Sequence, residues 1–262
     1  MDSLVLRLVL APALIAVASL AGRRWGPTIS GWLVGLPLTS GPIVFLLALA
    51  YGTSFAAHAA RGTLAGVISL AVYSLGYAWT SRRFGWQVSV AAGGLMFAIA
   101  TLALQHVTLP LPALIGAILI ALVVALALMP APARQASVAV SGAAPRWNLP
   151  ARMAIAATFV LLLTGVASLL GPQLTGLVSP FPVYATILAV FAHRQLGGRA
   201  AADVLRGMLV GLFAFVAFFL VIAIQIEQAG VGAAFGVAIV VALLAQGVSL
   251  WLMRLQRRRL AS

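Results

Sequence analysis

The sequence predicts an all-α integral membrane protein with nine transmembrane helices, and three observations predict this class. Of the 262 residues, 63% are hydrophobic and only 7% are charged, which lies far outside the composition of soluble domains. Apolar runs of about 20 residues, the length that crosses a bilayer, recur along the whole chain. Glycines, prolines and arginines also match at a constant offset of 145 residues, which indicates an internal duplication.

The nine expected spans are apolar runs separated by short connections, except after the fifth, where a longer segment rich in Ala, Pro and Ser follows. This segment, 130–150, is expected to be a flexible linker. The fifth span carries no polar side chain and is expected to face lipid. The spans are 4–21, 28–51, 62–80, 87–105, 111–129, 151–170, 173–193, 204–226 and 231–253.

All 16 basic residues are arginines, and they fall mainly on one side of the predicted bundle. Fourteen lie in the connections after spans one, three, five and seven or at the C-terminus, whereas only Arg7 and Arg61 lie on the other side. Because basic connections stay in the cytoplasm, we expect an outside N-terminus and a cytoplasmic C-terminus. The net charge of +13 is thereby explained by topology, and we expect the lipid bilayer as a partner and no nucleic acid.

The matched positions predict an inverted 4+1+4 repeat: a first four-helix repeat in 1–110, a linker helix and linker in 111–150, and a second repeat in 151–262. Equivalent spans are five apart, an odd number, so the two copies are predicted to face opposite ways across the membrane. The matching residues constrain the backbone or the charge pattern. They are Gly26-Pro27 and Gly171-Pro172, Gly31 and Gly176, Pro37 and Pro182, Gly52 and Gly197, Arg61-Gly62 and Arg206-Gly207, Gly66 and Gly211, and Gly85 and Gly230.

Spans two and seven are predicted to be broken helices, because both carry proline at the depth of the hydrocarbon core. In lipid, the freed backbone groups must be satisfied by protein or water. Paired breaks at matching positions of two halves indicate a transport site, although hydroxyl and small residues at this depth also serve to pack helices. The candidate substrate-binding residues are Pro37, Thr39, Ser40, Gly41, Pro180, Pro182, Tyr184 and Thr186.

Three charged residues are candidates for a charge or gating role: Arg61, Asp203 and Arg206. Arg61 lies on the side that the arginines otherwise avoid, so it could attract an anion or pair with a partner; as an alternative, it is an interfacial arginine that reaches water. Asp203 and Arg206 are three residues apart on one helical face and could form a local pair.

The chain offers little for catalysis. It has no cysteine, its three histidines show no metal-ligand spacing, and none of its three acids, Asp2, Asp203 and Glu227, lies in the middle of a span. We therefore expect no enzymatic activity, no metal and no cofactor.

The four-span unit resembles the GlpM-like family of small membrane proteins, and the second half matches it more closely. The matching features are Arg152, the run from Gly176 to Pro182, Ala192-His193, and Asp203 three residues before Arg206. The first half keeps Arg7, Gly31, Pro37 and Arg61, but has His58 where an acid is expected and Gly35-Leu36-Pro37 in place of Pro180-Phe181-Pro182. The resemblance implies the fold and a location in the bacterial inner membrane, and it implies no particular activity.

From these features we expect a transporter or channel for a small polar or anionic solute, because arginine is in excess and no carboxylate lies mid-span. The alternative is a non-transporting scaffold or partner subunit of an envelope polysaccharide or lipid system; a third reading is a lipid-phosphate flippase. The sequence leaves the solute and the oligomeric state open.

Overall fold

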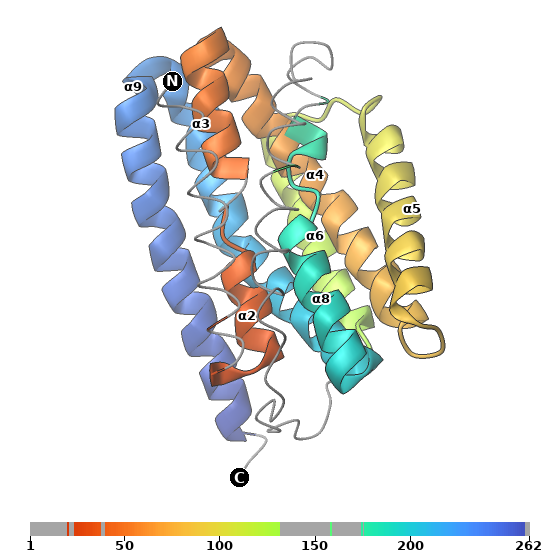
Figure 1. Ribbon diagram of the computed structural model, residues 1–262. Coiled ribbons are helices and arrows are strands. Elements are labelled where there is room, and N and C mark those ends of the chain that lie inside the picture. The colour runs from red at the N-terminus through yellow and green to blue at the C-terminus, as the bar shows by residue number, and fades with distance from the viewer. Residues whose placement is uncertain are drawn as a thin grey trace.

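The computed structural model describes residues 24–37, 40–131 and 176–259, together with Leu20, Thr158 and Leu174. Every regular element in these residues is a helix (Figure 1), which confirms the predicted all-α class. Within the described residues, five helical segments are long and apolar enough to cross a membrane, one of them being Gly176–Leu196, which includes a turn. The predicted first spans of the two repeats, 4–21 and 151–170, lie almost entirely outside the described residues, as do Thr39 and 132–150. The count of nine spans therefore stays a prediction.

The predicted second span is interrupted where its proline indicates. It forms α2 (Pro27–Val34) and α3 (Ser40–Tyr51), with a turn between them. Pro37 has no N–H to continue the helix; instead the N–H of Leu36 bonds the carbonyl of Leu33 at 3.2 Å, and α3 restarts with the Gly41 N–H on the carbonyl of Pro37 at 2.9 Å. The predicted break is thus present as two short helices.

The predicted seventh span also changes geometry at its prolines. Helical residues 176–178 lead into a turn, and α8 (Val183–Leu196) begins immediately after Pro182. Pro182 has φ −83° and ψ 56°, and the Val183 N–H bonds the carbonyl of Phe181 at 2.8 Å. This is an inverse γ-turn, which redirects the chain within the 21-residue apolar segment Gly176–Leu196.

Single glycines join the broken spans to the long helices that follow. Gly52 separates α3 from α4 (Thr53–Thr80), and Gly197 separates α8 from α9 (Gly198–Arg259). Gly52 has φ 90° and ψ 170°, and Gly197 has φ 89° and ψ 172°. Only glycine adopts this region without strain, so a one-residue connection reverses the chain at both places, 145 residues apart.

The long helix α9 is two helical arms joined at Gly230, which has φ 76° and ψ 172°. In Figure 1 the arm before Gly230 and the arm after it lie antiparallel. The first arm contains the predicted span eight, 204–226, and the second contains the predicted span nine, 231–253; each arm is longer than the span predicted for it. The remaining helices are α5 (Trp86–Leu104), which follows Gly85, and α6 (Leu111–Leu128), which starts with proline in its first turn.

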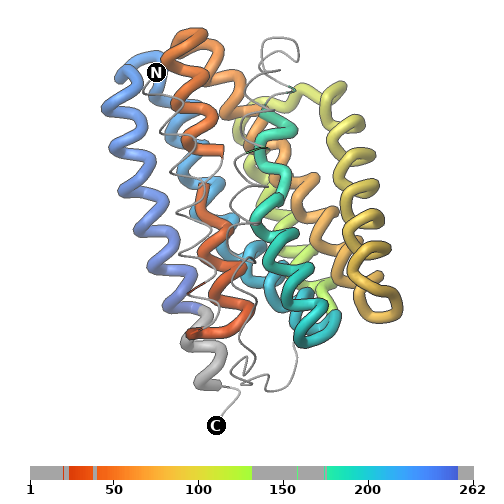
Figure 2. Tube along the Cα trace, in the orientation of Figure 1, coloured from red at the N-terminus to blue at the C-terminus, as the bar shows by residue number. Residues whose placement is uncertain are grey.

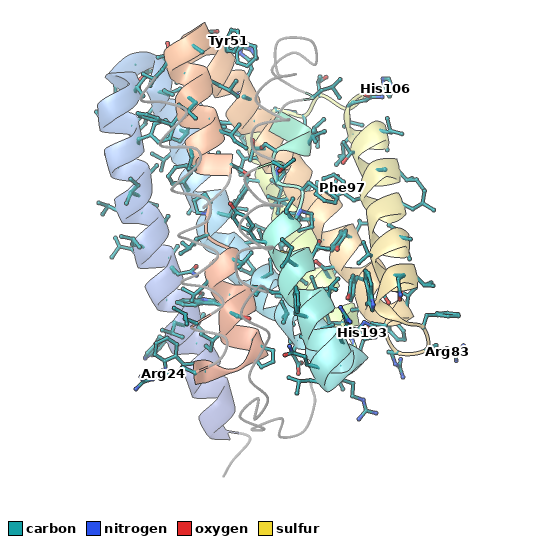
Figure 3. The ribbon with its side chains drawn as sticks, in the orientation of Figure 1. Arg24, Tyr51, Arg83, Phe97, His106 and His193 are labelled. Carbon is teal, nitrogen blue, oxygen red and sulfur yellow. The ribbon has the colours of Figure 1, made fainter. Side chains whose placement is uncertain are left out.

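Corresponding elements of the two halves run in opposite directions (Figure 2). The chain rises through α2 and α3 but descends through α8; it descends through α4 but rises through the first arm of α9. It rises through α5 and descends through the second arm of α9. In Figure 3, Arg24, Arg83 and His193 lie at one end of the bundle and Tyr51 and His106 at the other, which agrees with the predicted sorting of the arginines.

The expectation that the fifth span faces lipid holds for only one of its sides. Leu114, Ile118, Leu122 and Ala125 of α6 are buried, and α6 packs against α4 and α9. The opposite face exposes Ile120, Val123 and other apolar side chains. Hydropathy did not distinguish these faces, because a bilayer and a helix interface are equally apolar.

Candidate functional site

The two interruptions meet through a cluster of three buried hydroxyl groups, which we call the crossing cluster: Ser40, Thr63 and Ser179. The Ser40 hydroxyl donates to the carbonyl of Ser179 at 3.0 Å, and the hydroxyls of Thr63 and Ser179 lie 3.0 Å apart. The three side chains are at most 2% exposed. The cluster therefore ties the start of α3 and the turn before α8 to α4.

The backbone beside the crossing cluster completes its hydrogen bonding. The Ser179 hydroxyl lies 3.0 Å from the carbonyl of Gly176, and the Thr63 hydroxyl lies 2.8 Å from that of Ala59. Each hydroxyl has one proton, so it donates either to its carbonyl or to the other hydroxyl. Hydroxyl groups both donate and accept, so the cluster can exchange these internal partners for a polar ligand. It cannot supply a charge.

A second polar contact lies just beyond the cluster. The hydroxyls of Tyr73 on α4 and Thr186 on α8 are 2.6 Å apart. Phe181, between the two prolines of the break, packs edge-on against Tyr73 and Phe97, with ring centroids 6.1 Å and 5.1 Å away. Phe97 lies midway between the two ends in Figure 3, which places the break of the seventh span near the middle of the bundle.

Glycines allow the broken helices to approach their neighbours closely. A side chain at Gly31 of α2 would overlap the carbonyl oxygen of Val204 in α9, and one at Gly176 would overlap that of Ala59 in α4. Both contacts are between backbone atoms, so a change of side-chain rotamer could not relieve the overlap. Helix interfaces in membranes use small residues in this way.

Some contacts between the halves are reciprocal: a residue of one half touches a residue of the other, and the two positions 145 residues away from them along the chain also touch. Three pairs of contacts obey this rule. They are Gly31 with Val204 and Gly176 with Ala59; Gly35 with Gly211 and Pro180 with Gly66; and Gly41 with Phe218 and Thr186 with Tyr73.

The break in the second span is also held from the second arm of α9. The carbonyl of Trp32, in the last turn of α2, accepts the N–H of Gly35 at 3.2 Å and also a hydrogen bond from the Gln246 side chain at 2.9 Å. The Trp32 indole N–H donates to the hydroxyl of Ser249 at 2.8 Å. Gln246 and Ser249 are buried, so they satisfy polar groups of the broken helix inside the apolar bundle, as lipid requires.

Among the predicted binding residues, the structure brings Ser40 and Thr186 into these contacts. Gly41 packs against the ring of Phe218: a Cβ atom added at Gly41 would lie 3.6 Å from this ring. Tyr184 is 4% exposed, while Pro37, Pro180 and Pro182 shape the breaks. Thr39 lies outside the described residues.

Sequence reasoning missed Thr63, Ser179, Tyr73 and Gln246. Two of these had a local signal: Ser179 stands directly before Pro180, and Thr63 directly after the matched pair Arg61-Gly62. Tyr73 and Gln246 lie inside unbroken helical stretches, so only the packing reveals that they meet the breaks.

The charged candidates are not gathered at the crossing cluster. The Arg206 guanidinium instead donates to the carbonyls of Leu126, Met129 and Pro130 at 3.5, 3.2 and 2.6 Å, at the end of α6. Asp203 is buried, at 9% exposed. Arg61 is exposed, while Ala59, Ala60 and Thr63 beside it on α4 are fully buried.

Among the described residues, no group of three His, Asp or Glu side chains could hold a metal ion. No family model, curated protein or solved structure matches the chain. The resemblance to the GlpM-like family therefore stays a prediction, and the function is argued from the geometry.

Proposed function

We propose that this protein is a membrane transporter or channel for a small polar or anionic solute, with its site where two broken helices cross. The observation that carries the proposal is the crossing cluster. Its hydroxyls join both interruptions near the middle of the bundle, where groups that bind a solute must replace its water. A hydroxyl-lined site without a carboxylate suits a neutral polar solute or an anion better than a cation.

An inverted repeat is part of the proposal, and three features support it. The reciprocal contact pairs are those expected of two copies related by a two-fold axis, in which each copy offers the same surface to the other. Corresponding elements run in opposite directions (Figure 1). Gly52 and Gly197, which we call the hinge glycines because each joins a broken span to the helix after it, have nearly identical φ and ψ. In transporters of this design, the site lies at the interface between the inverted copies.

The crossing cluster is closed in this structure, since its hydroxyls are buried and bonded to one another and to backbone carbonyls. A solute would enter when the contact between Ser40 and Ser179 opens and the freed groups turn to the solute. The two halves would then move as packed bodies about the crossing, as in rigid-body gating.

Reconstitution into proteoliposomes tests the proposal, with a screen of anions first and neutral polar solutes second. For a solute that is transported, Thr63→Val should lower the flux and raise the half-saturating concentration, because it removes a hydroxyl from the cluster. Ser74→Ala is the matched control: Ser74 is also buried on α4, but its hydroxyl bonds only the carbonyl of Leu70 on the same helix, at 2.8 Å. Equal flux in both variants would contradict the assignment of the site.

The close packing favours a second candidate, a non-transporting scaffold or partner subunit. Gly31 leaves no space for a methyl group against α9, and Gly176 leaves none against α4, as expected where helices only need to pack. A scaffold predicts that Thr63→Val lowers thermal stability and that no solute in the screen is carried. Measuring stability and flux on the same preparations separates the two candidates.

A further inference from the structure

Arg61 and Arg206 occupy corresponding positions, each nine residues after a hinge glycine, Gly52 or Gly197. Their surroundings differ. Arg206 donates to three carbonyls at the end of α6. Arg61 is exposed, and none of the described residues forms a hydrogen bond or an ion pair with it. The difference follows from the chain order, because the helix that satisfies Arg206 is the fifth span, which has no counterpart in the other half.

At the position of Arg61, a guanidinium surrounded only by hydrocarbon would be energetically unfavourable. It lies eight residues inside α4, a helix long and apolar enough to span a membrane, hence about 12 Å from the helix start. An arginine at this depth extends toward the headgroup region. There α4 and the preceding residues carry aromatic rings: Tyr51 and Phe55 stack with centroids 4.9 Å apart, and Tyr51 is exposed. Aromatic side chains mark the headgroup level of a bilayer.

The neighbouring histidine does not share the role of Arg61. The His58 ring nitrogen Nδ1 lies 2.9 Å from the carbonyl of Ser54, which can only accept, so Nδ1 carries the proton. In the neutral ring, Nε2 then has no proton to donate. Arg61 thus supplies a charged donor on this exposed face, with a planar fork of N–H groups that matches the oxygens of a phosphate.

We infer that Arg61 binds the phosphate of an anionic lipid headgroup, in the leaflet at the Tyr51 end of the bundle. At Arg206, carbonyl oxygens at the end of α6 accept hydrogen bonds from the guanidinium. At Arg61, the phosphate oxygens of the lipid would be the acceptors instead, again at the membrane boundary. A lipid is the source of phosphate favoured here, because Arg61 projects from the outer face of α4, away from the buried residues Ala59 and Thr63 that line the crossing.

The test uses the full chain, which contains no cysteine, so a single reporter can be placed at exposed Ser54. Ser54→Cys is labelled with a fluorophore in phosphatidylcholine vesicles that contain either nitroxide-labelled phosphatidylcholine or nitroxide-labelled phosphatidylglycerol. Quenching by nitroxide-labelled phosphatidylglycerol should indicate binding about fivefold stronger than that of nitroxide-labelled phosphatidylcholine. A factor of about five is the contribution expected of one arginine at an anionic membrane surface. The preference should disappear in Arg61→Gln and persist in part in Arg61→Lys.

Two matched variants show whether the effect is local. Arg83→Gln removes an arginine from the opposite end (Figure 3), and His58→Gln removes the neighbouring ring; both should keep the preference. An equal response to the two lipids in the unmutated chain, or an undiminished preference in Arg61→Gln, would overturn the inference. Loss of the preference on adding inorganic phosphate would also overturn it, since the site would then be one for a soluble anion. No outcome depends on solute flux, so this site and the proposed function fail separately.

Discussion

At the scale of single residues, hydroxyls and glycines form the contacts around the interruptions of the second and seventh spans. The hydroxyls of Ser40, Thr63 and Ser179 bond across the interruptions, and glycines bring the backbones into contact. The sequence could indicate Ser40, which lies between Pro37 and Pro42, because a break needs polar partners nearby. It could not indicate Tyr73 or Gln246, because their role depends on which helices pack together.

The close approach at Gly31 predicts a large effect of a single methyl group. Gly31→Ala would press its Cβ against the backbone of Val204, and overpacking of this kind costs about 1–3 kcal/mol. Thermal unfolding in detergent should show a clear loss of stability. Gly116→Ala is the control: it has nothing within 4 Å of the added Cβ, and alanine favours a helix over glycine by about 0.5–1 kcal/mol. A Gly31→Ala protein as stable as Gly116→Ala would contradict the close contact.

At the scale of elements, the breaks in spans two and seven could be predicted, whereas the role of α6 could not. Proline removes a donor wherever it stands, so its effect is visible in the sequence. The buried face of α6 depends on partners far away in the chain. The C-terminal carbonyls of α6 are bound from both halves: by the Trp79 indole N–H at the carbonyl of Leu128, at 3.0 Å, and by Arg206. The linker helix thus fastens the halves together at one end.

This fastening predicts unequal effects of two corresponding arginine substitutions. Arg206→Met would leave carbonyls at the end of α6 without a donor, at a cost of about 1–3 kcal/mol. Arg61→Met, at the corresponding position, should change thermal stability little in a neutral detergent, because Arg61 contacts no acceptor among the described residues. Equal melting temperatures for the two variants would show that the contact between Arg206 and α6 contributes nothing to stability.

At the scale of the whole molecule, the reciprocal contacts and opposite chain directions agree with the duplication that matched glycines, prolines and arginines indicate in the sequence. Matching alanines or leucines would have carried little information in so apolar a chain. The sequence could match Gly52 with Gly197, but it predicts longer connections, 52–61 and 194–203, after spans two and seven. It could not indicate that α4 and α9 begin immediately after these glycines. The predicted orientation in the membrane is based on the arginines, because apolar spans alone are compatible with either orientation.

The central claim is that the crossing of the two broken helices must open for a solute to pass. The chain lacks cysteine, so Ser40→Cys/Ser179→Cys introduces one pair at the contact that joins the interruptions. The direct measurement is solute flux in proteoliposomes before and after this pair is joined by a short cross-linker that reduction cleaves, with the two single-cysteine variants as controls. We predict that cross-linking stops the flux, that reduction restores it, and that the single variants do not respond. Full flux through completely cross-linked protein would contradict the claim.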